Sequence, residues 1–513
     1  MISKIHSLAV NGLSSHIIDV EVDINNGLPN FTIVGLPDQG VQESKERLRS
    51  AFKASGAKLP PTRITVNLAP ADIKKVGPSF DLPIAIGILL NDEHIQKDTR
   101  IAKSIFLGEL SLDGKLRKVS SVLPATIGAR DAGYENIFIP KINAREASTI
   151  PGINVYGIET LSELIDFLNE EKEIQAESLL SIQDLKILKQ EKKSKYDFKY
   201  IIGQEHAKRA LEIAAAGGHN IIMSGPPGSG KTMLARGLQT ILPDLTIDES
   251  IEISKLYSIS GLLSQENPLI IERPFRSVHH TASSVSIIGG GMHAKPGEIS
   301  LSHKGVLFFD EILEFQKTVL EVLRQPLEDG MITVTRVNAS FTYPAKFMLV
   351  GAMNPCPCGY LTDPDKECIC THNQIKNYSS RLSGPLIDRV DIFIEVPKVK
   401  TEKFGVKDNY DGIESSYDVK TRVQKARDRQ IERFSGLKIS ANSEMNTEEI
   451  NKFCQLDMES DVLLKGAVEM LKLSARSYYR ILKLARTIAD LEGKENISSA
   501  HILEALSFRK KED

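Results

Sequence analysis

The sequence predicts a multidomain α/β protein: a mixed α/β part at the N-terminus, a core built on a parallel sheet, and a helical part at the C-terminus. The chain of 513 residues is too long for one hydrophobic core, and such a length favours about three domains. Residues 197–395 alternate apolar, strand-like runs with helical patterns around a glycine-rich loop, which is typical of a parallel sheet covered by helices. Beyond residue 415 the apolar residues recur with helical spacing.

Changes in the pattern divide the chain. Alternation of apolar and polar residues, as in 17–22, predicts strands in the N-terminal part. The stretch that follows is charged and poor in aromatics, which is typical of a linker. Near the C-terminus, residues 474–491 predict a helix with Ser474 as its N-cap and Gly493 after its end. We therefore expect an N-terminal domain over 1–168, a charged linker over 169–196, a core over 197–395, and a helical lid and C-terminal domain over 396–513.

The composition restricts the class of protein. A hydrophobic fraction of 41% and a charged fraction of 26% are those of a soluble globular chain. The net charge of −3 confines any basic surface to a local site, such as the lining of a pore. The first residues contain no long apolar segment, and no apolar run is long enough to cross a bilayer. We expect a cytoplasmic protein without a membrane partner.

The glycine-rich loop has the pattern of a phosphate-binding loop. It follows the apolar run 220–224 and leads into a helical pattern, which is the setting that the loop chemistry requires. Its backbone N–H groups and the helix N-terminus attract phosphate. Lys231 can reach the β- and γ-phosphates of a nucleotide, and the Thr232 hydroxyl can hold Mg²⁺. The loop consists of Gly225, Pro226, Pro227, Gly228, Ser229, Gly230, Lys231 and Thr232.

Two further apolar runs end in polar residues that suit nucleotide hydrolysis. The run 306–309 ends in Asp310, placed to hold the Mg²⁺ shell, and in Glu311, the better candidate for activating water. Paired with the phosphate loop, these acids favour hydrolysis over an apolar strand that ends in acids by chance. The run 347–353 ends in Asn354, which could orient the attacking water or be an ordinary turn residue.

Two arginines are candidates for stabilising charge in the transition state. Arg389 follows a short helical pattern and could neutralise a neighbour's γ-phosphate, although on its own it reads as a surface ion pair. Arg476 lies at the start of the predicted C-terminal helix, and Arg480 follows it.

Four of the five cysteines form two close pairs, Cys356 with Cys358 and Cys368 with Cys370. This pattern favours a structural Zn²⁺ site with four thiolates, and free buried thiols are the alternative. The site would brace the segment between Asn354 and Arg389. Cys454 is solitary and is expected to serve packing.

In this order the motifs resemble the AAA+ ATPases and, within them, the magnesium-chelatase-like branch. The stretches 275–280, 296–305 and 354–359 are similar to that branch, and the chain is identified as a member of the ComM/YifB family over nearly its whole length. The resemblance implies ATP and Mg²⁺ as ligands and a homo-oligomeric ring, with a hexamer as the expected size. It assigns Lys231 and Thr232 to Walker A, Asp310 and Glu311 to Walker B, Asn354 to sensor 1, Arg389 to a trans-acting arginine finger and Arg476 to sensor 2.

The resemblance also suggests where cargo is held. Inserts at 281–291 and 331–342 are expected to point into the ring channel, where Lys295 and Arg336 could contact phosphates. Solvated loop charges are the alternative for both residues. The inserts lack an aromatic stacking platform, so sequence-specific reading of a single strand is not expected. The segment 201–204 looks like the one that packs near adenine in this class.

The N-terminal part resembles the Lon protease domain, an α/β fold of the ribosomal S5 domain 2-like type. Ser79 falls where that family has its nucleophile. The lysine that must take the serine's proton falls at Leu123, and leucine cannot act as a base. Lys118 and Lys141 are out of register. We expect an inactive domain without proteolysis.

The resulting expectation is an ATP-hydrolysing ring motor that acts as a DNA helicase or branch-migration factor in recombination or natural transformation. Two alternatives remain open: a metal-insertion motor of the chelatase type, and an unfoldase or scaffold that works on a protein partner. The cargo that stimulates hydrolysis distinguishes among them.

Overall fold

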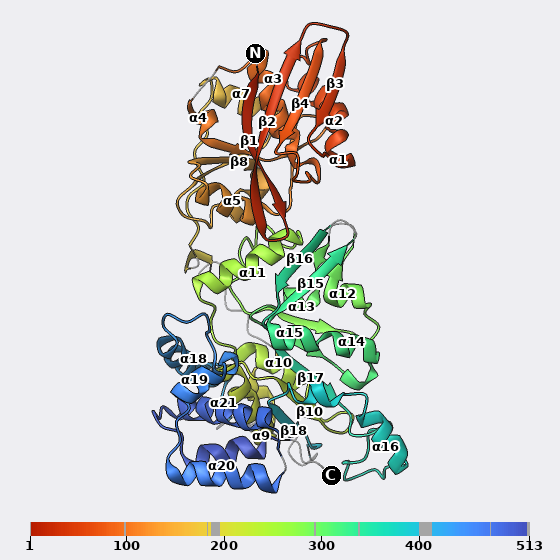
Figure 1. Cartoon of the computed structure of the whole chain (residues 1–513), viewed down its shortest axis with the longest axis vertical. Coiled ribbons are helices and arrows are strands. Elements are labelled where there is room, and N and C mark those ends of the chain that lie inside the picture. The colour runs from red at the N-terminus through yellow and green to blue at the C-terminus, as the bar shows by residue number, and fades with distance from the viewer. Residues whose placement is uncertain are drawn as a thin grey trace. The chain divides into compact units, whose positions relative to one another are not determined.

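The computed structural model describes residues 2–96, 99–181, 183–185, 195–291, 294–336, 339–399, 413–471 and 473–509 (Figure 1). The chain forms two compact units. The first contains Met1–Gln190 and Ile247–Ile271, and the second contains Glu191–Thr246 and Glu272–Asp513. Among the described residues, no helix has both the length and the apolar character needed to cross a lipid bilayer.

The first unit is built on a seven-stranded mixed sheet with the strand order β3-β4-β2-β1-β5-β8-β9. The pairs β1–β2 and β2–β4 are antiparallel, and the other neighbours run parallel. Alternation along β2 buries Ile18, Val20 and Val22 on one face, as its sequence pattern predicts. The strands are β1 (Ser3–Asn11), β2 (Ser14–Asn25), β3 (Asn30–Val34), β4 (Arg63–Ala69), β5 (Ser104–Phe106), β8 (Asn136–Pro140) and β9 (Asn154–Ile158), with a small hairpin of β6 (Glu109–Leu110) and β7 (Leu116–Arg117).

Helices cover this sheet, and α3 (Asp81–Asn91) is the most deeply buried of them. Its long apolar run packs against β1 and β2. The other helices of the N-terminal stretch are α1 (Gln39–Gln42), α2 (Ser44–Ala54), α4 (Thr99–Ala102), α5 (Val122–Asp131), α6 (Lys141–Ala147) and α7 (Leu161–Leu168).

A segment from the middle of the chain completes the first unit. Helix α11 (Ile247–Ile259) packs against α5, and Ser258 Oγ hydrogen-bonds the buried carboxylate of Glu146 at 2.5 Å. Leu269 and Ile271 join Leu123 in a small apolar cluster. The sequence placed these residues within the 197–395 core, whereas their apolar side chains are buried together with N-terminal residues.

The second unit has a five-stranded parallel sheet with the order β11-β14-β17-β10-β18. This confirms the predicted parallel-sheet core. Because all five strands run in one direction, their carboxyl ends share one edge, where ligands of open α/β sheets bind. The strands are β10 (Ile221–Ser224), β11 (Phe275–Val278), β14 (Val306–Phe309), β17 (Met348–Met353) and β18 (Ile392–Glu395).

Two smaller β elements belong to the second unit. They are the hairpin of β15 (Met331–Arg336) and β16 (Ala339–Pro344), and the short pair β12 (Gly289–Gly290) and β13 (Lys295–Pro296). The helices around the core are α9 (Glu205–Gly217), α10 (Lys231–Ile241), α12 (Ser284–Ile288), α13 (Glu298–Leu301), α14 (Lys317–Val322), α15 (Arg324–Asp329), α16 (His372–Ser379) and α17 (Gly384–Ile387).

The C-terminal residues are helical, as the sequence predicts, and we call these helices the lid. Helix α21 (Ala475–Glu492) has Ser474 as its N-cap, and Gly493 follows it in the left-handed conformation (φ 77°), as the sequence predicts. The other lid helices are α18 (Ser416–Arg433), α19 (Thr447–Phe453), α20 (Met458–Met470) and α22 (Ser499–Ser507).

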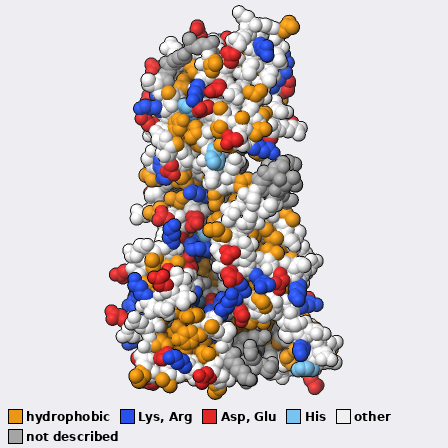
Figure 2. Space-filling model, in the orientation of Figure 1, with side chains coloured by type: hydrophobic (Ala, Val, Ile, Leu, Met, Phe, Trp, Pro, Cys, Tyr) orange, Lys and Arg blue, Asp and Glu red, His pale blue; other side chains and the backbone are white. Residues whose placement is uncertain are grey.

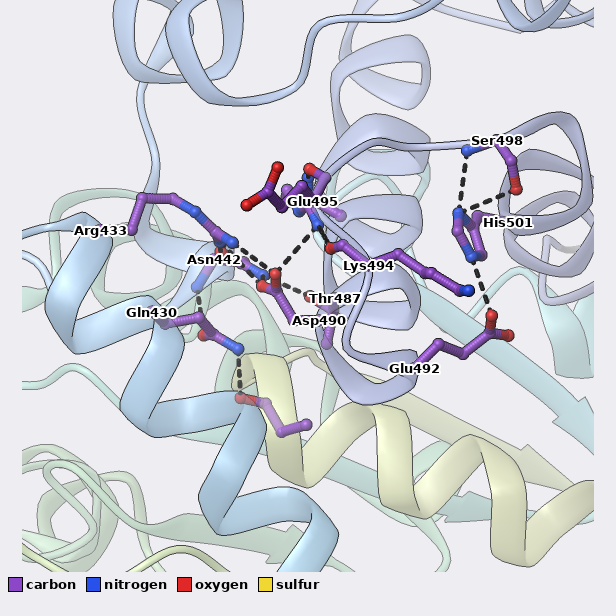
Figure 3. Close-up of polar contacts among 12 residues, drawn as sticks. Gln430, Arg433, Asn442, Thr487, Asp490, Glu492, Lys494, Glu495, Ser498 and His501 are labelled. Carbon is purple, nitrogen blue, oxygen red and sulfur yellow. Dashed lines mark hydrogen bonds and ion pairs between the residues drawn. The ribbon is translucent and has the colours of Figure 1, made fainter.

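A buried polar network fixes α21 to its neighbours (Figure 3). Asp490 accepts hydrogen bonds from Arg433 and, at 2.8 Å, from Asn442 Nδ2, and it lies 3.1 Å from Arg486. Gln430 Nε2 donates to Ala216 O at the end of α9. The network therefore ties the helix that begins near Arg476 to α18 and to the core.

Candidate functional site

The phosphate loop lies between β10 and α10, as the sequence predicts. Gly228 and Gly230 have φ of 78° and 88°, a region that favours glycine. Gly225 is required for a different reason, because a Cβ there would lie 2.2 Å from the carbonyl oxygen of Val396. The loop therefore packs tightly against the chain that leaves β18, and the first turn of α10 opens at its end.

Lys231 lies across the loop. Its Nζ donates to Gly225 O at 2.7 Å and to Pro226 O at 2.9 Å, and it lies 3.4 Å from Asn354 Oδ1. Burial lowers the pKa of Lys231, and the charges of Asp310 and Glu311 oppose that shift. A phosphate group would compensate the buried ammonium charge better than neutral carbonyls do.

The two Walker motifs meet at Thr232 and Asp310. Thr232 Oγ1 donates to Asp310 Oδ2 at 3.0 Å, so a hydroxyl and a carboxylate oxygen converge. Oxygen donors of these two types are the ones that bind Mg²⁺ beside nucleotide phosphates. Glu311, the next residue, is exposed and has φ of 52°, an uncommon conformation for a non-glycine residue. Lys231, Thr232, Asp310, Glu311 and Asn354 thus gather at the carboxyl ends of β10, β14 and β17.

The two predicted arginines lie together, away from this group. Arg389 is buried and donates to Pro385 O at 2.6 Å and to the carboxylate of Glu328. Arg476 Nη2 donates to the other oxygen of Glu328 at 3.3 Å. Both line a cavity of about 520 Å³ whose lining includes no residue of the phosphate loop. Figure 2 shows basic and acidic side chains gathered on this face of the second unit, near α15.

A second ion pair fixes the base of this cavity. Arg480 Nη1 donates to Asp391 Oδ1 at 2.6 Å. Burial raises the pKa of Asp391, but the charge of Arg480 and the interaction with His219 outweigh burial and hold that pKa well below its usual range. Asp391 also accepts from the backbone N–H of Asn220, just before β10. The lid helix α21 is thereby tied to the start of β10.

The four clustered cysteines converge as predicted. The Sγ atoms of Cys356, Cys358, Cys368 and Cys370 lie within 4.8 Å of one another. Three of the Sγ pairs are 3.4, 3.6 and 3.7 Å apart. Tetrahedral Zn²⁺ with Zn–S bonds of about 2.3 Å requires S···S separations of about 3.8 Å, so the thiols fit that ion. A hydrogen bond from the Tyr360 N–H is the largest cause that lowers the pKa of Cys358 to about 6.

The cysteine segment touches the phosphate loop. A Cβ on Gly359 would lie 2.8 Å from Pro227, so Gly359 permits this close approach. Asn354 lies two residues before Cys356. The cluster is therefore placed to support both the loop and Asn354. Cys454, the fifth cysteine, is buried in the core of the second unit, in keeping with a packing role.

The two inserts form one lobe in the second unit (Figure 1). Tyr343 on β16 is buried and donates to Ala294 O at 2.9 Å, which connects the hairpin to the insert before β13. Thr333 and Thr342 pair their hydroxyls across the exposed face of the hairpin, as do Thr335 and Ser340. Lys295 is exposed. The side chain of Arg336 lies outside the described part of the structure.

The structure places the N-terminal residues that the protease resemblance singled out, while the inactivity of the domain stays a prediction. Leu123 is fully buried among apolar side chains, so no basic group occupies that position. Lys118 Nζ donates to Leu263 O at 2.6 Å, and Lys141 pairs with Glu177 at 2.5 Å. Lys75, four residues before Ser79, is buried and donates to Pro70 O. The Lon-like identity of this domain stays a prediction.

Glu328 escaped sequence analysis, and Gln204 was included there only as part of the segment 201–204. Glu328 is one of many exposed acids, and no motif marks it. Gln204 Nε2 donates to Ser229 O at 2.6 Å and to Pro397 O at 3.1 Å, which fixes the segment 201–204 against the phosphate loop. The resemblance of that segment to the adenine-side stretch was the one signal for Gln204.

Comparison with known families covers most of the chain. The family described as magnesium chelatase, subunit ChlI, matches residues 197–404. The family described as subunit ChlI of Mg-chelatase matches residues 20–143. The family described as magnesium chelatase, subunit ChlI C-terminal, matches residues 413–509.

Individual relatives match over different lengths. The chain is 44% identical to competence protein ComM of Haemophilus influenzae, over 98% of this chain and 97% of that protein. It is 40% identical to protein YifB of Escherichia coli, over 99% and 97%. The magnesium-chelatase subunit ChlI of Mesostigma viride is 25% identical over 63% of this chain and 88% of its own length. The sheet order, the phosphate loop and the full-length matches show that the chain belongs to the ComM/YifB family of magnesium-chelatase-like AAA+ proteins.

Proposed function

We propose that this protein is an ATP-hydrolysing ring motor that moves along branched or single-stranded DNA, as a helicase or branch-migration factor in recombination or natural transformation. The observation that supports ATP hydrolysis is the convergence of four side chains at the carboxyl ends of three neighbouring parallel strands. They are those of Lys231, Thr232, Asp310 and Asn354. The full-length likeness to a protein named for competence favours DNA as the cargo.

Each residue of the site has a defined part in the hydrolysis. The loop N–H groups and Lys231 would hold the phosphates of ATP. Thr232 and Asp310 would hold Mg²⁺, which neutralises charge on the phosphate oxygens. Glu311 would accept the proton of the attacking water, and Asn354 would orient that water. The position of Arg389 and Arg476 apart from their own phosphate loop supports action on the nucleotide of an adjacent subunit.

A head-to-tail assembly follows from that division of labour. If each subunit binds ATP on one side and supplies arginines from another, the contact is heterologous, and it forms a ring when the rotation between subunits closes. We propose a hexamer, as the resemblance implies. The lobe made by the hairpin and the insert supplies exposed hydroxyls and Lys295, groups that can hydrogen-bond or pair with a phosphate backbone without reading bases.

We also propose a structural Zn²⁺ at the four cysteines. The donor set and its spacing fit the ion, and the contact between Gly359 and Pro227 explains why the site would matter for the phosphate loop.

The test measures ATP hydrolysis by the purified protein with and without forked, single-stranded and duplex DNA. We expect forked or single-stranded DNA to raise turnover and ATP to support strand displacement. Glu311→Gln should still bind ATP but lose most hydrolysis, by about 10²-fold or more, because it removes the base. Wild-type turnover that no DNA changes would contradict the DNA part of the proposal.

The alternative is a motor that acts on a protein partner, as a remodelling factor or in the manner of a metal chelatase. The likeness to a magnesium-chelatase subunit is the observation that favours it. Hydrolysis that responds to a protein partner and to none of the DNA substrates would support this alternative.

A further inference from the structure

Glu328 is an exposed acidic residue at which two arginines from distant parts of the sequence meet. It lies on α15, while Arg389 precedes β18 and Arg476 lies in the first turn of α21. Each arginine donates to a different oxygen of the same carboxylate. Among the ion pairs of the described residues, neither arginine has a second carboxylate partner.

The carboxylate of Glu328 supplies a single negative charge to the two guanidinium groups of Arg389 and Arg476. The side chain of Arg389 is only 8% exposed, and its Nε has no hydrogen-bond partner within the described structure. Burial lowers the pKa of Arg389, and so do the charges of Arg476, Arg324 and Arg480. This environment favours an anion with more charge and more acceptor oxygens than a carboxylate has.

A phosphate group meets that description. Guanidinium groups bind carboxylate and phosphate through the same planar set of donors, so the two anions compete for one site. Glu328 therefore occupies the donors that the γ-phosphate of an adjacent subunit's nucleotide would need.

Glu328 is also connected to the hairpin β15–β16, which we propose contacts the cargo. Helix α15 ends at Asp329, Gly330 follows with φ of 65°, and β15 begins at Met331. Ala345 N donates to Gly330 O at 2.8 Å, so both ends of the hairpin close on the end of α15. A displacement of Glu328 would be passed to the base of the hairpin through two residues.

We propose that Glu328 is a positioning residue that holds Arg389 and Arg476 until the adjacent subunit's γ-phosphate replaces its carboxylate, and that this exchange couples nucleotide binding to the hairpin β15–β16. The inference rests on the proposed function, because it takes the two arginines to act on a neighbouring nucleotide. It adds a residue, and a route from the nucleotide to the cargo, that the family motifs do not contain.

The test compares ATP hydrolysis by wild type, Glu328→Gln and Glu328→Ala, with Asp329→Asn as the matched control. Asp329→Asn removes the same charge from the next residue of α15, which pairs with neither arginine in the described structure. Without the competing carboxylate, the KM for ATP should fall by about three- to tenfold in both Glu328 variants, a size typical of a modest ionic coupling. The kcat should change by less than the KM does, and stimulation by forked DNA should weaken.

The outcomes separate this inference from the proposed function. Glu328 variants with the KM of Asp329→Asn, in a protein that hydrolyses ATP normally, would overturn the role of Glu328 alone. A lower KM with full DNA stimulation would support the competition and overturn the coupling to the hairpin. If DNA does not stimulate wild type, the proposed cargo fails, while the KM comparison still decides on the competition.

Discussion

Glu444 shows how a single carboxylate is set by its neighbours. It accepts from Lys304 Nζ at 3.1 Å and from Lys346 Nζ at 3.0 Å, and it lines the same cavity as Arg389 and Arg476. Burial raises its pKa, but the two lysines together outweigh burial and lower the pKa to about 2. The carboxylate therefore stays ionised far below the pH at which a free glutamate takes up a proton.

This shift predicts a pH dependence of stability. Because the folded pKa lies below the ordinary value of 4.5, Glu444 contributes fully above pH 4.5, and its contribution is lost as the pH falls towards 2. We expect Glu444→Gln to lower the free energy of unfolding by up to about 3 kcal/mol at pH 7 and by progressively less at lower pH. The urea midpoints of the variant and wild type should approach each other as the pH falls from 5 to 3 and converge towards pH 2. A constant difference across that range would contradict the prediction, and Glu432→Gln, an exposed acid on α18, is the control.

At the scale of elements, the lid depends on the buried carboxylate of Asp490 (Figure 3). Asp490→Ala would leave Arg433 and Arg486 in the interior without their counter-charge. Breaking a buried pair in this way costs about 3 to 5 kcal/mol. We expect a corresponding drop in the unfolding free energy of the second unit, measured by urea denaturation.

Asp461→Ala is the matched control for the lid. It removes an exposed aspartate that pairs with Lys465 one turn along α20, and such a pair is worth about 0.5 kcal/mol or less. Equal effects of the two substitutions would show that the network does not support α21.

The cysteine segment gives a second prediction at this scale. We expect one Zn²⁺ per chain by metal analysis of freshly purified protein, and loss of that zinc in Cys356→Ser. The rate of ATP hydrolysis should fall when zinc is lost, because the cysteine segment packs on Pro227 of the phosphate loop. Cys454→Ala should keep the zinc, since Cys454 lies outside the cluster. Zinc-free wild-type protein with full activity would refute the site.

At the scale of the whole molecule, the proposed trans action of Arg389 can be tested by mixing inactive subunits. Arg389→Ala keeps Glu311, and Glu311→Gln keeps Arg389. In mixed rings some subunits with an intact Glu311 would face a neighbour with an intact Arg389, at about a quarter of the sites if equal amounts assemble at random. We expect ATP hydrolysis to rise from the level of either variant towards that fraction of wild type.

The control for the mixing experiment is each variant alone, taken through the same refolding or reassembly procedure. Activity in the mixed sample that does not exceed either variant would mean that Arg389 acts within its own subunit or not at all.

How far the site could be predicted depends on the range of the contacts involved. Lys231 and Thr232 were predictable because a phosphate loop is a local structure in which adjacent residues form the whole cradle. Asp310 and Asn354 were predictable because each follows an apolar strand, and parallel strands bring their carboxyl ends to one edge. Glu328 was not, because its partners lie 61 and 148 residues away and nothing local marks it.

The same distinction holds for the fold. The sequence by itself determined the parallel-sheet core, the phosphate loop, the cysteine set and the lid helix with its caps, since periodicity, loop chemistry and capping act over a few residues. Tertiary structure alone decided that Ile247–Ile271 pack with the N-terminal unit and that Arg389 and Arg476 share one carboxylate. The physical reason is that burial and ion pairing depend on which surfaces meet in space, and those surfaces come from segments that the chain order keeps far apart.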